Sequence, residues 1–167
     1  MGAMWKDKPR SHALVALGTS WERSFVFIKP LTFMNASGEF LKPLLAYHKC
    51  AAKEMIVIHD DVAFPPGHLK LSRNCGDGGH NGVKDVTRVV GPDFLRFRLG
   101  VGAKRDGRMD LADHVLGRLA PEELGELERN SDFFWDSLRL TVDKGCAHAM
   151  NAVNQRKKAR NTNDEQT

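Results

Sequence analysis

The sequence Met-Ile-Val-Ile-His-Asp at residues 55–60 constrains the fold of this 167-residue chain more than any other stretch. It is a short, continuous apolar run that stops at charged residues, the pattern of a β-strand buried on both faces. Two further strands are predicted at 12–18 and 24–29 around a polar turn, and residues 68–72 and 94–102 alternate as strands do. Helical patterns separate several of these strands, which predicts an α/β fold.

Helical periodicity follows the segment Thr-Phe-Met-Asn-Ala-Ser-Gly-Glu-Phe at residues 32–40. We expect Asn35 or Ser37 to cap this helix, and Pro43 to kink it or delay its start. Three more helices are predicted, at about residues 81–90, from Pro121 through Leu138, and near 146–154. Together these elements predict a twisted mixed sheet flanked by helices.

Composition is that of a globular protein, with 41% hydrophobic and 28% charged residues. We expect one domain over residues 1–155 and a basic, polar and disordered tail over residues 156–167. No apolar run is long enough to span a bilayer, and three widely spaced cysteines do not suggest a disulfide framework, so we expect no membrane association and a cytoplasmic location. The net charge of +4 weakly favours a polyanionic partner.

Polar residues with catalytic potential stand at two places. The stretch Gly-Asp-Gly-Gly-His-Asn-Gly at residues 76–82 places His80 and Asn81 at the start of a predicted helix, where Asn81 is also a candidate for an ordinary helix cap. Asp60 ends the buried strand, at the rim where α/β proteins bind ligands, and either orients an imidazole or caps a turn. A metal site at His59, Asp60, Asp61 and His80 is a weaker alternative, because consecutive strand residues point to opposite faces.

Basic side chains flank the glycine-rich stretch on two predicted strands. Three cations, Lys70, Arg96 and Arg98, are placed to bind phosphates of a nucleic-acid backbone. Such contacts fix the position of the protein on the nucleic acid without recognising its base sequence. The simpler interpretation is an ordinary solvated strand face, and for Arg96 we prefer it.

Four motifs, in order, resemble the bacterial peptidyl-tRNA hydrolases, and the resemblance extends from about Ser11 to Asn154. They are PLTFMNASG (30–38), IVIHDDVAFPPGHLKL (56–71), GGHNGVKD (78–85) and FRLGVG (97–102). The resemblance implies a hydrolase with a single α/β domain that cleaves the ester between a peptide and the 3′ end of tRNA. It implies tRNA as partner, a monomer, and neither metal nor organic cofactor.

The resemblance also implies roles for the residues at the reacting end of the substrate. Asp60 matches an aspartate that orients the catalytic histidine. Asn81 matches a residue that binds substrate and helps to place the attacking water. His80 matches a cleft residue near the scissile bond. An activated water and carboxamide donors suit ester hydrolysis, because negative charge develops on the carbonyl oxygen.

Two further pairs are assigned by the same resemblance. Met34 and Asn35 match the pair whose asparagine contacts the peptide portion of the substrate. Lys70 and Arg98 match the basic pair that binds a tRNA phosphate near the acceptor stem.

One departure from the family pattern is large. The family begins with a strand ending in GNPG, followed by RHN, whose histidine is the general base, and this sequence contains neither; His12 does not correspond to it. We expect that the first strand of the sheet is missing because the start was assigned to an internal methionine. The alternatives are a non-catalytic RNA-binding protein on the same scaffold and an unrelated hydrolase with a metal at His59, Asp60 and His80.

Overall fold

The chain divides into two compact units in the computed structural model, which describes residues 4–8, 12–103 and 117–164. The first unit comprises Met1–Met55 and Arg73–Phe94, and the second comprises Ile56–Ser72 and Leu95–Thr167. Each unit combines a small sheet with helices, so the predicted α/β class is confirmed.

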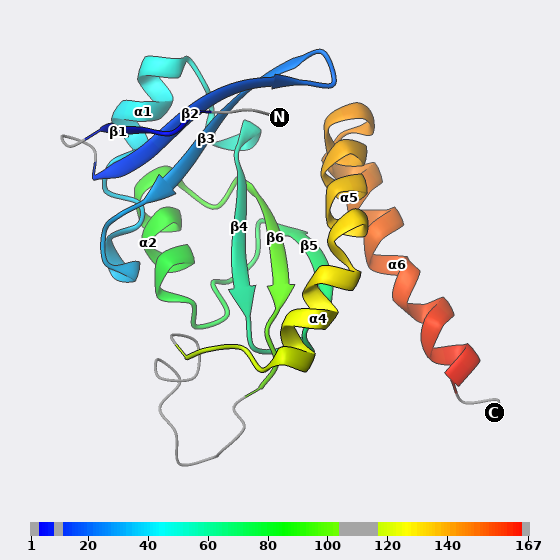
Figure 1. Cartoon of the computed structure of the whole chain (residues 1–167). Coiled ribbons are helices and arrows are strands. Elements are labelled where there is room, and N and C mark those ends of the chain that lie inside the picture. The colour runs from blue at the N-terminus through cyan, green and yellow to red at the C-terminus, as the bar shows by residue number, and fades with distance from the viewer. Residues whose placement is uncertain (1–3, 9–11, 104–116, 165–167) are drawn as a thin grey trace. The chain divides into compact units, whose positions relative to one another are not determined.

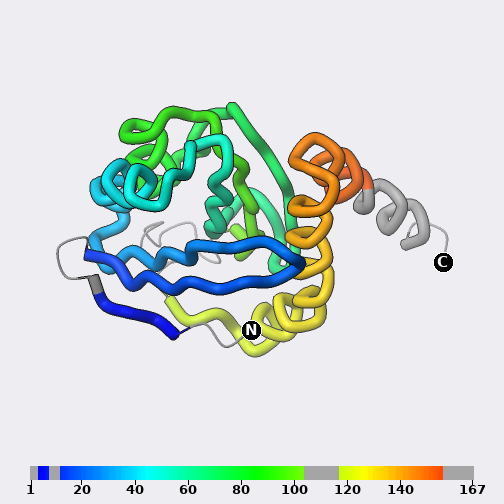
Figure 2. Tube along the Cα trace, turned by 90° about the horizontal axis from the view of Figure 1, so that it is seen from above, coloured from blue at the N-terminus to red at the C-terminus, as the bar shows by residue number. Residues whose placement is uncertain are grey.

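The sheet of the first unit is an antiparallel three-stranded ribbon of β1 (Lys6–Lys8), β2 (Ala13–Ser20) and β3 (Arg23–Pro30). The tube in Figure 2 shows β2 and β3 as a long hairpin with β1 alongside β2. Trp21 and Glu22 form its two-residue turn, both with positive φ, which matches the twist of the strands. The two predicted strands around a polar turn are confirmed.

The helices of the first unit follow this hairpin. A short 3₁₀ turn, η2 (Met34–Ala36), precedes α1 (Leu41–His48), and η3 (Ala52–Glu54) follows it. Helix α1 starts at Leu41 and so places Pro43 in its first turn, where a missing N–H costs nothing. The expected caps were wrong, because Phe40 precedes α1 without a side-chain cap and Asn35 lies within η2.

The sheet of the second unit has the order β4-β6-β5, with β4 (Ile56–Asp61), β5 (Leu69–Arg73) and β6 (Leu95–Gly100). β4 and β6 are parallel, with Asp61 opposite Gly100 (Figure 1). The described strands thus form two small sheets, an antiparallel one in the first unit and one that contains a parallel pair in the second.

Two burial predictions for this sheet were wrong. β4 is the outer strand of its sheet among the described residues, and Ile58 on it is 59% exposed, so this strand is not buried on both faces. Arg96, expected on a solvated face, is only 4% exposed because it lies on β6, the central strand.

Three helices complete the described part of the second unit: α4 (Pro121–Arg129), α5 (Ser131–Lys144) and α6 (Cys146–Asp164). The single long helix predicted from Pro121 is broken at Asn130, whose side-chain amide donates to the Glu126 carbonyl. The backbone of helix α6 extends to Asp164, into the tail predicted for residues 156–167. Lysine, arginine and glutamine have high helix propensity, which is consistent with a helical backbone here.

The core of the second unit lies between the sheet and the last helices. Six buried residues form it: Leu69, Leu71, Leu95, Phe97, Ala149 and Val153. Asn154 fastens α6 to β5, because its side chain both accepts from the Leu71 N–H and donates to the Leu71 carbonyl, each at 2.9 Å. Within the described ranges, none of the helices has the length and apolarity that a membrane span requires.

Candidate functional site

The Met34-Asn35 turn and the start of α2 (Asn81–Val90) lie together in the first unit. A Cβ atom built on Gly82 would be 2.5 Å from Met34 Sδ and 3.3 Å from the Met34 carbonyl oxygen. Glycine at this position therefore allows the turn to contact the helix start. Four predicted site residues, Met34, Asn35, His80 and Asn81, come from these two adjacent segments.

His80, and not Asn81, is the N-cap of α2. Its Nδ1 accepts hydrogen bonds from the backbone N–H groups of Gly82 at 3.1 Å and Val83 at 3.3 Å. Because Nδ1 accepts, the proton of the neutral ring must be on Nε2. His80 thus carries its proton on Nε2, and Asn81 is exposed at the first turn of the helix.

Asp85 fixes this arrangement from the next turn of α2. Its buried carboxylate accepts from the Gly38 N–H at 2.8 Å and from the Arg88 guanidinium. A Cβ atom on Gly38 would lie 2.8 Å from the Asp85 carbonyl oxygen, so the chain after η2 lies directly against the helix. Burial by itself would raise the pKa of Asp85, but the hydrogen bonds from Arg88 and Gly38 and the Arg88 charge hold it below its ordinary value.

Sequence reasoning did not single out Asp85. An aspartate three residues before an arginine on an amphipathic helix is common on protein surfaces, where such pairs have little effect. Its structural role follows from the contact with Gly38, 47 residues away in sequence, because this contact joins α2 to the chain after η2.

The second unit carries the other three predicted residues. Asp60 lies half-buried near the carboxyl end of β4, next to His59, which is 9% exposed. The His59 Nδ1 is 2.7 Å from the Asp60 carbonyl oxygen. A carbonyl only accepts, so Nδ1 carries the proton and Nε2 is the basic nitrogen of the neutral ring.

Lys70 and Arg98 converge on one aromatic ring. The Lys70 Nζ lies 5.5 Å from the centroid of Phe64, and the Arg98 guanidinium carbon lies 4.9 Å from it. Arg98 Nε also donates to Asp61 Oδ2 at 2.7 Å. The predicted basic pair is therefore a cluster of two cations, one carboxylate and one ring.

Backbone hydrogen bonds join the loop that carries Phe64 to the end of β6 and the two residues that follow it. The N–H groups of Gly100, Val101 and Gly102 donate to the carbonyls of His68, Asp61 and Phe64, at 2.7, 3.2 and 2.9 Å. A Cβ atom on Gly100 would overlap the Pro65 carbonyl oxygen, so glycine is required for this close approach.

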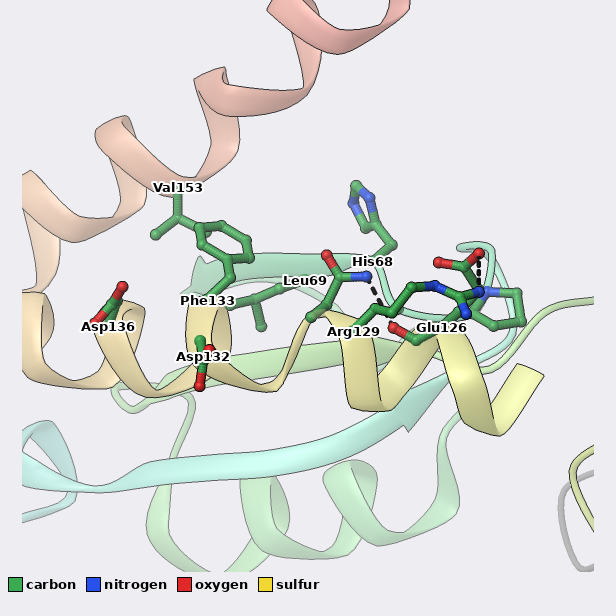
Figure 3. Close-up of a pocket in the computed structure, with 11 residues that line it drawn as sticks. His68, Leu69, Glu126, Arg129, Asp132, Phe133, Asp136 and Val153 are labelled. Carbon is green, nitrogen blue, oxygen red and sulfur yellow. Dashed lines mark hydrogen bonds and ion pairs between the residues drawn. The ribbon is translucent and has the colours of Figure 1, made fainter. Parts of the chain in front are cut away.

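A separate pocket of about 330 Å³ lies in the second unit between α4, α5 and the start of β5 (Figure 3). Its lining includes His68, Phe133, Asp136 and the ion pair of Arg129 with Glu126. None of the seven predicted site residues lines it.

The metal alternative has no geometric support. In the described ranges, no three His, Cys, Asp or Glu side chains are arranged to hold a metal ion. His59 and His80 belong to different units.

Comparison with known proteins agrees with the motif resemblance over almost the whole chain. The protein-family model described as peptidyl-tRNA hydrolase matches residues 1–162. The peptidyl-tRNA hydrolase of Anaeromyxobacter sp. (strain K) is 40% identical over 159 residues, which is 95% of this chain and 82% of that protein. That of Mycobacterium tuberculosis (strain ATCC 25177 / H37Ra) is 38% identical over 154 residues, 92% of this chain and 80% of that protein.

The same result comes from solved structures. The crystal structure of peptidyl-tRNA hydrolase from Acinetobacter baumannii matches with a TM-score of 0.83 at 29% identity, covering 92% of this chain and 78% of that one. The fold and motifs thus define a hydrolase with a mixed α/β fold. The chain belongs to the peptidyl-tRNA hydrolase family. The alternative of a non-catalytic RNA-binding protein receives no support from these comparisons.

Proposed function

We propose that this chain hydrolyses the ester bond between a peptide and the 3′ end of tRNA, and so recycles tRNA from peptidyl-tRNA released by ribosomes. The observation that carries the proposal is the match of 95% of the chain, at 40% identity, to a relative named peptidyl-tRNA hydrolase. The proposal includes a cytoplasmic, monomeric enzyme with tRNA as its partner.

The first unit supplies hydrogen-bonding groups for the ester and the peptide. Asn81 binds the substrate and helps to place the attacking water, and the His80 Nε2–H donates toward the scissile end. Asn35, beside Met34, contacts the peptide portion. Donors fixed before the reaction stabilise the negative oxygen of a tetrahedral intermediate without reorganisation. The support is the contact of η2 with the helix start and the cap that fixes the His80 tautomer.

Asp60 is proposed to orient the imidazole that acts as general base. His80 does not suit that role, because its Nδ1 accepts two backbone hydrogen bonds and its Nε2 carries the proton. His59 has an unprotonated Nε2, as a general base requires, but its ring is buried. Replacing His59 and His80 separately by glutamine tests both: loss of turnover only in His59→Gln would assign the base to His59.

The reaction is tested with an N-acetylated aminoacyl-tRNA, with the unblocked aminoacyl-tRNA as control. We expect release of the amino acid from the blocked substrate only. The Asn81→Ala variant should lower kcat by about 100-fold, because removing one donor to a developing oxyanion has an effect of that order. Lys84→Ala, an exposed change on the same helix, is the matched control and should retain activity. A folded chain that binds tRNA but releases nothing from either substrate would contradict the proposal.

A further inference from the structure

Phe64 has an environment that the sequence did not suggest. Its ring is stacked on His68, with centroids 4.5 Å apart and an interplanar angle of 24°. The Arg98 guanidinium and the Lys70 ammonium lie 4.9 and 5.5 Å from its centroid, within the range of cation–π attraction. One ring thus contacts two cations that come from different strands, β5 and β6.

Two like charges that share one site repel each other unless their surroundings offset the repulsion. Asp61 offsets part of it, because its Oδ2 accepts from Arg98 Nε at 2.7 Å, with both side chains largely buried. The negative face of the Phe64 ring supplies a second attraction, which acts on both cations at once. Asp61 is itself held by the Ala63 N–H, which donates to its Oδ1 at 2.9 Å.

The backbone of the loop that carries the ring is held by bonds that do not involve these cations. The Phe64 carbonyl accepts from the Gly102 N–H at 2.9 Å, and the loop on either side is bonded to Gly100 and Val101. The loop backbone at Phe64 is therefore held by hydrogen bonds to Gly100, Val101 and Gly102, and the flexible Lys70 side chain is the group that contact with the ring can order.

We propose that Phe64 is a positioning residue that holds the Lys70 ammonium and the Arg98 guanidinium side by side to bind a phosphate of tRNA. This inference rests on the proposed function. With Nε bonded to Asp61, the terminal nitrogens of Arg98 remain to bind the phosphate, and Lys70 adds a second charge. The cluster of Lys70, Arg98 and Asp61 carries one net positive charge, which suits an anionic ligand.

The test compares Phe64→Leu with Phe64→Tyr, which keeps the ring. We expect Phe64→Leu to raise the Kd for deacylated tRNA and the KM for N-acetylated aminoacyl-tRNA by about fivefold each, with kcat unchanged, and Phe64→Tyr to retain wild-type values. Trp135→Leu on α5 removes another aromatic side chain, which is 57% exposed, and is the matched control. If Phe64→Leu fails to fold, Phe64→Met, which conserves volume better, replaces it.

A double-mutant cycle with Lys70→Ala separates positioning from general packing. If Phe64 acts through Lys70, the effect of Phe64→Leu on tRNA affinity shrinks when Lys70 is absent. Additive effects, or equal affinities for wild type and Phe64→Leu, would overturn the inference. A wild-type chain that neither binds tRNA nor hydrolyses the ester would instead contradict the proposed function.

Discussion

The η2–α2 region of the first unit and the β4–β6 end of the second unit are organised by different forces. In the first, glycines allow backbone to contact backbone, and the buried carboxylate of Asp85 binds the Gly38 N–H. In the second, a loop is bonded to a strand end, and its aromatic ring orders long cationic side chains.

The difference corresponds to what each region is proposed to bind. Neutral carboxamide and imidazole donors must be fixed precisely to act on one carbonyl, and short contacts to backbone achieve this. A phosphate is bound by charge over a longer range, so flexible cations suffice once their mutual repulsion is offset. Substitutions of His80 and Asn81 in the first region should therefore change kcat, and those of Phe64, Lys70 and Arg98 in the second should change KM.

The largest expected effect is that of Gly100→Ala. The new methyl group would overlap the Pro65 carbonyl oxygen and lie 2.9 Å from the Phe64 carbonyl oxygen, so the loop must move away from β6. We expect the free energy of unfolding to fall by about 3 kcal/mol, the upper part of the usual range for overpacking. Urea denaturation measures it.

Gly76→Ala is the matched control, because a Cβ atom there meets nothing within 4 Å. It should change the free energy of unfolding by less than about 0.5 kcal/mol. Equal stability of the two variants would show that the loop does not need its close contact with β6.

The next effect is that of Asp85→Asn in the first unit. Its carboxylate accepts from Gly38 and Arg88, and losing hydrogen bonds to a charged group should lower the free energy of unfolding by about 2 kcal/mol at neutral pH. The exposed pair of Asp93 with Arg73 is the control, and Asp93→Asn should have an effect below about 0.5 kcal/mol.

The Asp85 effect should depend on pH. Because the folded-state pKa of Asp85 lies below its ordinary value of 3.8, the carboxylate stabilises the fold above that value and loses this contribution as pH falls through the folded pKa. The stability difference between wild type and Asp85→Asn should therefore shrink below about pH 4. A difference that stays constant at lower pH would contradict the assignment.

The smallest effect concerns Asn154→Ala, which removes the two hydrogen bonds to Leu71 at the outer side of β5. We expect a loss of about 1 kcal/mol in the free energy of unfolding, because water can reach the freed backbone groups beside this exposed residue. Asn151→Ala, an exposed asparagine on the same helix, should leave stability unchanged. Equal melting temperatures for all three proteins would show that Asn154 does not fasten the helix.

Local patterns predicted most of the elements but few of their boundaries. The α2 range and the first hairpin agree with the periodicity because each depends on neighbouring residues. The break at Asn130 and the His80 cap were missed, because both depend on hydrogen bonds that a periodicity of apolar residues does not report.

By itself, the sequence determined the α/β class, the family and the identity of the residues proposed to bind substrate, since these follow from periodicity and from motifs that are contiguous in the chain. Only the tertiary structure revealed the roles of Asp85, Asn154 and Phe64. Asp85 and Asn154 contact segments 47 and 83 residues away, and Phe64 lies between side chains of two strands. Contacts at such separations are set by how the chain folds back on itself, and no local pattern encodes them.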